Sequence, residues 1–157
     1  MIKIAFVCHG NICRSPMAEF VFKKLIKELL VEEKYYVVSR ATSDEEIWGN
    51  IGNPIHRGTL GIFNKYSIPF DKNKRAVQLT KQDYEKYDLF IGMDYANLRN
   101  MQRIFGSDPQ NKIKLLLNYV GEDKEVADPW YTGDFDKTYE DILAGCQGIL
   151  STLGEEK

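Results

Sequence analysis

The first fifteen residues constrain the fold more than any other part of the chain, because a strand pattern there runs directly into a tight loop and a helix start. Residues 2–7, IKIAFV, are mostly apolar, as in a short strand covered on both faces. The loop from Cys8 is short, since Ser15 suits a helix N-cap and Pro16 suits the first helical position. This order of strand, loop and helix predicts an α/β fold with Cys8 at the carboxyl end of a strand.

The loop itself, C-H-G-N-I-C-R from Cys8 to Arg14, has the composition of an anion-binding nest. Gly10 and Asn11 tolerate the positive φ angles of so tight a curl, which aims backbone N–H groups inward. The following helix adds about half a positive charge at its N-terminus, and Arg14 offers a planar fork for two phosphate oxygens. The same field favours the thiolate form of Cys8, so the stretch predicts a phosphate cradle with a nucleophile at its centre.

Short β-favouring segments alternate with amphipathic segments along the rest of the chain. Strands of the sheet are expected at residues 2–7, 35–39, 89–93 and 113–117, with a brief further strand at 76–79. Helices are expected at residues 16–30, 54–66, just after Thr80, at 95–104 with Asp94 as cap, and at 135–150, with polar loops at 40–54 and 118–134. The alternation predicts a three-layer, doubly wound sheet of four parallel strands flanked by helices, with ligands at the carboxyl edge.

Composition limits the alternatives. A chain of 157 residues with 43% apolar residues is long enough for one domain, residues 1–157, and short for two. The net charge of −2, without a long basic or acidic block, gives no reason to expect nucleic acid or a membrane as partner. The apolar runs are far shorter than the roughly 20 residues that cross a bilayer, and no secretion signal precedes the first strand. A cytoplasmic monomer with a solvated end at residues 155–157 is expected.

Three cysteines and two histidines bear on redox and metal chemistry. Cys8, Cys13 and Cys146 contain no C-x-x-C pair and make a poor disulfide framework. His9 and His56 are far apart in the chain, so neither a metal site nor a cofactor is expected. Cys146 fits the apolar face of the last helix. Cys13 either fills the base of the loop or traps oxidised Cys8 as a disulfide.

Four motifs resemble those of the low-molecular-weight protein tyrosine phosphatases. They are V-C-H-G-N-I-C-R-S-P-M-A-E at residues 7–19, G-N-P at 52–54, G-M-D at 92–94 and D-P-W-Y at 128–131. The first motif is highly specific where it follows the first strand, and the matches extend over nearly the whole chain. The resemblance implies metal-independent hydrolysis of phosphotyrosine in a protein, or of a small aryl phosphate, with phosphate and other oxyanions as competitive ligands.

The resemblance also implies a role for the residues of these motifs. Cys8 attacks phosphorus as a thiolate and forms a phosphocysteine, while Arg14 and the loop amides hold the equatorial oxygens. Asp128 protonates the leaving phenol oxygen and then takes a proton from the attacking water. The residues expected to bind the substrate are His9, Gly10, Asn11, Ile12, Cys13, Ser15, Trp48, Trp130 and Tyr131.

Supporting roles follow from the same resemblance. Asn11 holds the curled backbone, and the hydroxyl of Ser15 donates to the sulfur of Cys8. Ser39, at the end of the second strand, resembles the family serine that braces Asn11. Tyr66 stands where many relatives complete this brace with a histidine.

Aromatic residues separate the rival functions. Trp130 and Tyr131 are expected to pack on the substrate ring opposite Trp48, in a cleft that suits a phenyl phosphate better than phosphoserine. A protein arginine phosphatase on the same scaffold tends to carry threonine where Ile12 stands, and an arsenate reductase needs further redox cysteines. A phosphocysteine carrier or a phosphate-binding module, which does not hydrolyse, should lack Arg14 and the acid.

Overall fold

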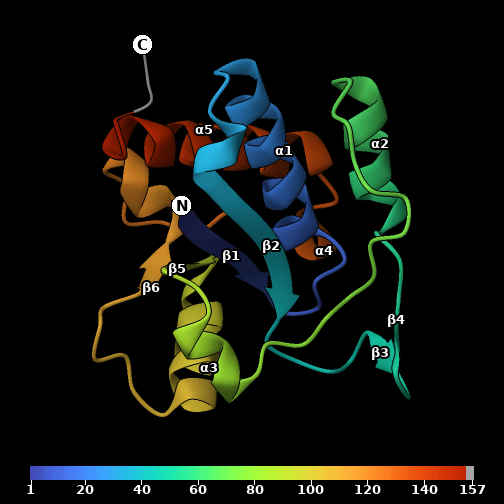
Figure 1. Cartoon of the computed structure of the whole chain (residues 1–157). Helices are drawn as coiled ribbons and strands as arrows, with labels where there is room; N and C mark the ends of the chain where they lie inside the picture. The colour runs from blue at the N-terminus through green and yellow to red at the C-terminus, as the bar shows by residue number, and fades with distance from the viewer. Residues whose placement is uncertain (155–157) are drawn as a thin grey trace.

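A sheet of four parallel strands forms the centre of the computed structural model, which describes residues 1–154 (Figure 1). The strands are β1 (Ile2–Cys8), β2 (Tyr35–Ala41), β5 (Leu89–Gly92) and β6 (Ile113–Leu115), in the order β2-β1-β5-β6. Cys8 pairs with Ala41 and Val7 with Gly92, so the carboxyl ends of these strands meet at one edge. The expected doubly wound α/β fold is confirmed. The end at residues 155–157 lies outside the described residues.

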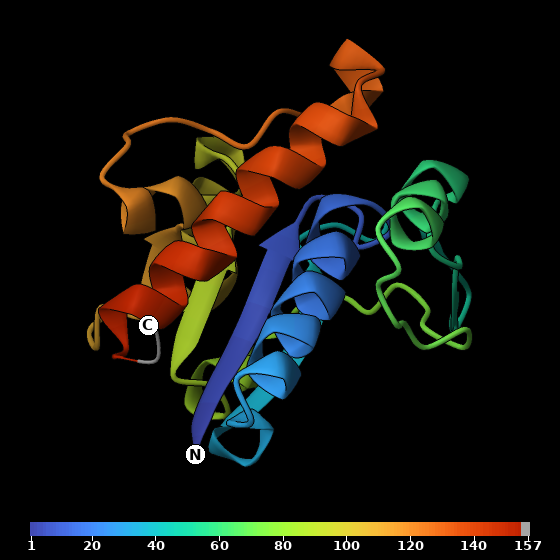
Figure 2. The same cartoon turned by 90° about the horizontal axis from the view of Figure 1, so that it is seen from above.

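Helices cover both faces of the sheet. α1 (Arg14–Glu28) and α5 (Phe135–Thr152) lie side by side on one face, and α3 (Tyr95–Phe105) lies on the other (Figures 1 and 2). α2 (Arg57–Lys65) packs against α1 and α5. The short elements are the 3-10 helices η1 (Glu32–Lys34), η2 (Lys81–Glu85) and η3 (Leu116–Val120), the helix α4 (Pro129–Thr132), and the hairpin of β3 (Ile47–Trp48) and β4 (Ile51–Gly52). The chain therefore has the three layers that the sequence predicts.

Side chains of β1 alternate between two hydrophobic clusters, one on each face of the sheet. Ile4 and Phe6 belong to the cluster that includes α1 and α5, and Ala5 and Val7 belong to the smaller cluster that includes α3. All four side chains are fully buried, as expected for a central parallel strand. Each fully buried Ile, Val or Phe side chain contributes about 1.5–3 kcal/mol. The strand that ends in Cys8 is therefore held firmly from both sides.

The start of α1 differs from the sequence prediction. The helix begins at Arg14 with Cys13 at its N-cap, so the prediction of Ser15 as the N-cap is wrong. Ser15 instead lies in the first turn, where its hydroxyl meets the sulfur of Cys8 rather than a helix amide. Pro16 remains within the first turn, where its missing N–H is tolerated.

Two helix caps show what sets the other boundaries. α2 begins at Arg57 and not at Pro54, because Nδ1 of His56 accepts the N–H of Gly58 at 3.0 Å and caps the helix there. The predicted cap of α3 is confirmed, since Oδ1 of Asp94 accepts the first-turn amide at 2.8 Å.

The prediction of a brief strand at residues 76–79 is wrong. The segment makes single bridges, Gln78 to Ala41 and Arg75 to Pro54, because it joins two different parts of the chain instead of running beside one of them. The loop expected at 40–54 contains the β3–β4 hairpin. The strand expected at 113–117 ends at Leu115, where the chain turns into η3.

Candidate active site

The loop between β1 and α1 curls around the sulfur of Cys8. The backbone N–H groups of Asn11 and Ser15 donate to Cys8 Sγ at 3.3 and 3.4 Å, and Ser15 Oγ lies 3.0 Å from the same sulfur. The N-terminus of α1 adds its positive partial charge at this point. Two backbone donors, the hydroxyl of Ser15 and a helix end therefore surround one sulfur, which is an environment that stabilises a thiolate.

Asn11 holds the loop in its curled form. Its φ of 58° lies in the left-handed region, which is unusual outside glycine. The side-chain Oδ1 accepts the backbone N–H of Val77 at 2.9 Å and Nζ of Lys74 at 2.9 Å, while Nδ2 donates to Ser15 Oγ at 2.8 Å. Ser15 Oγ also accepts the thiol proton of Cys8 at 3.0 Å and donates to the carbonyl of Arg40 at 3.5 Å. When Cys8 is a thiolate, the Ser15 hydroxyl can turn this proton to the sulfur.

Gly10 does not have the positive φ that the sequence analysis expected. A Cβ at Gly10 would lie 3.0 Å from Cγ of Glu46, so a larger residue here requires the Glu46 side chain to shift slightly. The left-handed turn of the loop falls on Asn11 instead.

The expected brace of Asn11 by the hydroxyl of Ser39 is also wrong, and Tyr66 lies elsewhere too. Ser39 faces α1, where its hydroxyl donates to Oε1 of Glu19 at 2.6 Å, because it pairs with Phe6 in the sheet and so lies behind the loop. The hydroxyl of Tyr66 donates to Asp136 at 3.0 Å. Lys74 and Val77 occupy the place of this brace.

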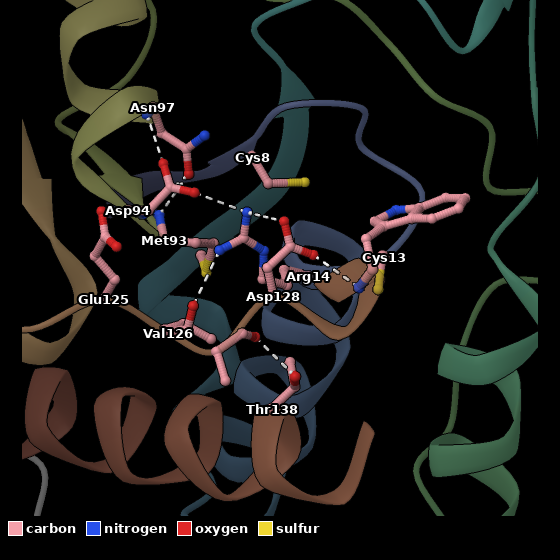
Figure 3. Close-up of polar contacts among 12 residues, drawn as sticks. Cys8, Cys13, Arg14, Met93, Asp94, Asn97, Glu125, Val126, Asp128 and Thr138 are labelled. Carbon is pink, nitrogen blue, oxygen red and sulfur yellow. Dashed lines mark hydrogen bonds and ion pairs between the residues drawn. The ribbon is translucent and has the colours of Figure 1, made fainter. Parts of the chain in front are cut away.

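Arg14 is buried beside the nucleophile candidate and is held by three oxygens. Nη1 donates to the carbonyl of Val126 at 3.1 Å, and Nη2 donates to carboxylates of Asp94 at 2.9 Å and Asp128 at 3.3 Å. Figure 3 shows the guanidinium between these two carboxylates. Burial alone lowers the pKa of Arg14, but the negative charges of Cys8, Asp128 and Asp94 outweigh it and raise the pKa above its ordinary value. The guanidinium is therefore a fixed positive charge.

Asp128 reaches the cleft from the loop that follows η3. Its Oδ1 accepts the N–H of Trp130 at 3.1 Å and caps α4, which leaves Oδ2 directed at Arg14. The preceding residue, Ala127, is tied to α5, since its carbonyl accepts from Thr138 at 2.8 Å (Figure 3) and its N–H donates to Asp141 at 3.1 Å. Asp128 and Arg14, which are 114 positions apart in the chain, are thus brought together at the sheet edge.

These groups line a cleft of about 760 Å³. The predicted site residues that line it are Cys8, His9, Gly10, Ile12, Cys13, Arg14, Asp128, Trp130 and Tyr131. The side chains of Asn11 and Ser15 are buried and do not line the cleft. Ser39, also buried, does not reach the cleft.

Trp48 is not part of the cleft wall, so this prediction is wrong. The β3–β4 hairpin pairs Trp48 with Ile51 and turns both outward, leaving them 74% and 68% exposed. Glu45 and Glu46, just before the hairpin, line the cleft instead, and Glu45 pairs with Nε2 of His9 at 2.9 Å. The short β3–β4 hairpin, which replaces the predicted loop, explains the difference.

The opposite wall has the expected aromatic residues. Trp130 and Tyr131 are 66% and 90% exposed at the mouth of the cleft, and the ring of Trp130 meets the edge of His56 at 5.4 Å. His56 in turn stacks on Phe135 at 5.5 Å. The wall therefore has a fixed base and exposed ring surface on which an aromatic group can pack.

Cys13 and Cys146 are chemically unlike Cys8. Burial raises the pKa of Cys13 to about 12, against a smaller opposite effect of the hydroxyl of Thr59, which donates to its sulfur at 3.4 Å. Burial likewise raises the pKa of Cys146, which is fully enclosed in the core. Both are thiols at neutral pH, and a disulfide between Cys8 and Cys13 stays a prediction. Within residues 1–154, no three His, Cys, Asp or Glu side chains gather into a metal-binding group.

The sequence matches the family model of the low molecular weight phosphotyrosine protein phosphatases over residues 3–157. The chain belongs to this family. The low molecular weight protein-tyrosine-phosphatase YfkJ of Bacillus subtilis is 39% identical over 160 residues, covering 100% of this chain and 99% of that protein. The crystal structure of YfkJ has a TM-score of 0.89 and covers 100% of this chain and 97% of that chain.

Two further solved structures share the fold over nearly their whole length. SP-PTP, a low molecular weight protein tyrosine phosphatase from Streptococcus pyogenes, is 43% identical with a TM-score of 0.85, covering 98% of this chain and 93% of that chain. DARP, described as a Drosophila arginine phosphatase, is 27% identical with a TM-score of 0.83, covering 98% of each chain. The protein is therefore a phosphatase. None of the helices within residues 1–154 has the length and apolar character needed to span a membrane.

Two charged groups of this phosphatase's site were missed or undervalued from sequence. Asp94 was expected mainly as a helix cap, yet capping uses only Oδ1 and leaves Oδ2 free for Arg14. A cap residue at the end of a strand beside the loop was the available signal. Lys74 had no such signal, because it lies in the basic stretch D-K-N-K-R, which is typical of an exposed turn.

Proposed function

We propose that this phosphatase hydrolyses phosphotyrosine in proteins, and small aryl phosphates, with Cys8 as nucleophile and Asp128 as general acid and base. The observation that carries the proposal is the convergence of the N–H groups of Asn11 and Ser15 on the sulfur of Cys8, with Arg14 in the same cleft. An anionic nucleophile and a dianionic phosphoryl group both need such donors.

In the first step, the thiolate of Cys8 attacks phosphorus on the side opposite the tyrosine oxygen. The S–P bond forms as the P–O bond to the ring breaks, and Asp128, which must carry a proton in this step, gives that proton to the departing oxygen. Arg14 and the loop amides hold the equatorial oxygens while charge is redistributed. Asp94 and the carbonyl of Val126 keep the guanidinium in place.

In the second step, water attacks the phosphocysteine. Asp128, now a carboxylate, takes a proton from this water as its oxygen bonds to phosphorus, and the S–P bond breaks to restore the thiolate of Cys8. The hydroxyl of Ser15, 3.0 Å from the sulfur, stabilises the departing thiolate. Inorganic phosphate leaves, and the same groups bind it as a competitive inhibitor.

The walls of the cleft favour an aromatic ester. Trp130 and Tyr131 present ring surface at its mouth, and Ile12 lines it from within. A phosphotyrosine side chain is long enough to place its ring between these residues while its phosphoryl group reaches the loop, whereas phosphoserine offers no ring to pack. We therefore expect the substrate to be a phosphotyrosine-bearing protein. The proposed nucleophile must be a free thiolate to act, which leads us to expect a reducing compartment such as the cytoplasm.

Hydrolysis of para-nitrophenyl phosphate and of a phosphotyrosine peptide tests the assignment. We expect Cys8→Ser to abolish turnover and Asp128→Asn to lower kcat by about 10²–10⁴-fold, since the positioned acid is lost. Asp123→Asn, an exposed carboxylate of the same segment, is the matched control and should keep full activity. Turnover that survives Cys8→Ser would refute the mechanism.

The rival functions are separated by the same assay with other substrates. Faster turnover of a phosphoarginine peptide than of the phosphotyrosine peptide would identify an arginine phosphatase. A stable phosphoprotein without turnover would identify a carrier. Ile12 and the aromatic wall lead us to expect the phosphotyrosine peptide to be preferred over both phosphoarginine and phosphoserine peptides.

A further inference from the structure

His56, the residue before α2, contacts three parts of the chain that meet near the cleft, and the mechanism above does not use it. Its backbone N–H donates to the carbonyl of Ile12, in the loop that follows Cys8, at 2.8 Å. Its Nδ1 accepts the N–H of Gly58 at 3.0 Å and caps α2. The cap fixes the rotation of the imidazole, because one edge of the ring must then face the helix.

The fixed imidazole lies between two rings of the segment that carries Asp128. The ring of Trp130 meets it at 5.4 Å between centroids with an interplanar angle of 62°, and the ring of Phe135 stacks on it at 5.5 Å and 10°. Within residues 1–154, the imidazole is the one ring that packs against Trp130. We call Trp130, His56 and Phe135 the aromatic column.

The aromatic column is rigid at its Phe135 end. Phe135 is the first residue of α5, and Oδ1 of Asp134 caps this helix by accepting the N–H of Lys137 at 2.9 Å. A Cβ at Gly58 would lie 2.2 Å from the ring of Phe135, so this ring rests on the backbone of α2. The other end of the column, Trp130, is exposed at the cleft mouth and depends on His56 for its ring contact.

Trp130 and Asp128 belong to one small unit. Oδ1 of Asp128 accepts the N–H of Trp130 at 3.1 Å, and the carbonyl of Asp128 accepts two further N–H groups of the same turn at 3.0 and 3.1 Å. This single turn, α4, is too short to be stable alone, so contacts outside it set its orientation. The bonds of Ala127 to α5 hold it on one side of Asp128, and the contact of Trp130 with His56 holds it on the other.

The orientation of this turn matters most for a poor leaving group. A general acid must lie about 2.6–3.2 Å from the oxygen that it protonates. The phenolate of tyrosine is a strong base and needs the proton of Asp128 as the P–O bond breaks. The anion of para-nitrophenol is a much weaker base and leaves with little help.

We propose that His56 is a positioning residue for the general acid: through the aromatic column it holds Trp130, and with Trp130 the carboxylate of Asp128, where the proton reaches the leaving phenol oxygen. The inference rests on the proposed role of Asp128. His56 does not line the cleft, so it acts on the substrate through its neighbours alone.

Two substitutions separate the ring of His56 from its cap. His56→Asn keeps an acceptor for the N–H of Gly58, since asparagine is a good N-cap, and removes the ring. His56→Phe keeps a ring and removes the acceptor. Tyr66→Asn is the matched control, because it removes a ring at the other end of α2 that stacks on Tyr139 of α5 at 4.1 Å. The readout is kcat/KM for phenyl phosphate and for para-nitrophenyl phosphate, which differ in their leaving groups.

We expect His56→Asn to lower kcat/KM by about tenfold for phenyl phosphate and by at most about twofold for para-nitrophenyl phosphate, since a displaced acid keeps only part of its effect. His56→Phe should restore most of the phenyl phosphate rate, and Tyr66→Asn should leave the ratio of the two substrates unchanged. A general loss of folded protein lowers both substrates equally. An unchanged ratio in His56→Asn would therefore overturn the proposal.

The general acid itself supplies a second test. In Asp128→Asn there is no proton to position, so adding His56→Asn should lower kcat/KM for phenyl phosphate little further, and another tenfold loss would overturn the proposal. If Asp128→Asn alone leaves phenyl phosphate turnover unchanged, the proposed acid is refuted instead. The two failures are thus distinguishable.

A spectroscopic test reads the position of Trp130 directly. In Trp48→Phe, Trp130 is the one remaining tryptophan, and its near-UV circular dichroism should weaken on adding His56→Asn and persist on adding His56→Phe. An indole signal that His56→Asn leaves unchanged would overturn the proposal. If His56→Asn does not fold, NMR of the wild type takes its place: we expect nuclear Overhauser effects between the rings of His56 and Trp130, and their absence would overturn the proposal.

Discussion

Lys74 has a consequence for stability that can be measured without any substrate. The fall of its pKa from 10.5 to about 8 means that the folded chain holds this proton less tightly than the unfolded chain does. Below pH 8 the fold therefore carries a penalty for Lys74, and the penalty decreases as the pH rises, because the folded state releases the proton first. The contribution of Lys74 to the free energy of unfolding should rise with pH between about 8 and 10.5.

The penalty is about 3 kcal/mol at neutral pH, since a change of one in pKa corresponds to about 1.36 kcal/mol. Between pH 7 and pH 9 the folded state loses most of the Lys74 proton while the unfolded state keeps it. Linkage then gives a gain of about 1.3 kcal/mol in the free energy of unfolding over this interval. The variant Lys74→Met has no such proton, so its stability should lack this rise.

Urea unfolding at pH 7, 8 and 9 measures the difference. Far-UV circular dichroism is the suitable signal, because Trp48 and Trp130 are 74% and 66% exposed and report little on the core. The raised pKa of Cys13 acts above pH 9 in both proteins and cancels in the comparison. Stability curves of wild type and Lys74→Met that run parallel from pH 7 to pH 9 would refute the reasoning.

Two further predictions follow from single positions. Gly58→Ala should lower the free energy of unfolding by about 1–3 kcal/mol, because the new Cβ would lie 2.2 Å from the ring of Phe135. Gly61→Ala lies in the same helix, where an added Cβ meets no neighbouring atom within 4 Å, and should raise the free energy of unfolding by about 0.5–1 kcal/mol. Urea unfolding compares the two variants, and a similar loss of stability in both would contradict the clash with Phe135. Arg14→Lys keeps the charge but loses the planar fork, so kcat/KM should fall by about 10²–10³-fold. Steady-state kinetics, with inhibition by inorganic phosphate, check this, and unchanged phosphate affinity would argue against a bidentate grip.

The strand, loop and helix at the start of the chain could be predicted because each signal there is local. Apolar residues mark β1, and the first turn of α1 is marked by Pro16. The same locality explains the confirmed cap at Asp94. The fold class followed from the alternation of such segments, which needs no knowledge of contacts between distant residues.

The errors arose where a residue's role depends on a partner far away in the chain. Lys74 lies 63 positions from Asn11, and nothing in its own neighbourhood sets it apart from Lys72. Ser39 was assigned to the loop although its position in the register directs it to α1. Trp48 was placed in the cleft because its aromatic character was visible and the hairpin that turns it outward was not.

The segment that leads from β2 into the β3–β4 hairpin is bonded to the loop of the reaction centre. The N–H groups of Thr42 and Ser43 donate to the carbonyls of Cys8 and His9, both at 3.0 Å, whereas the tip that bears Trp48 extends into solvent. The length and sequence of this tip can therefore change during evolution without altering the residues that carry out the reaction.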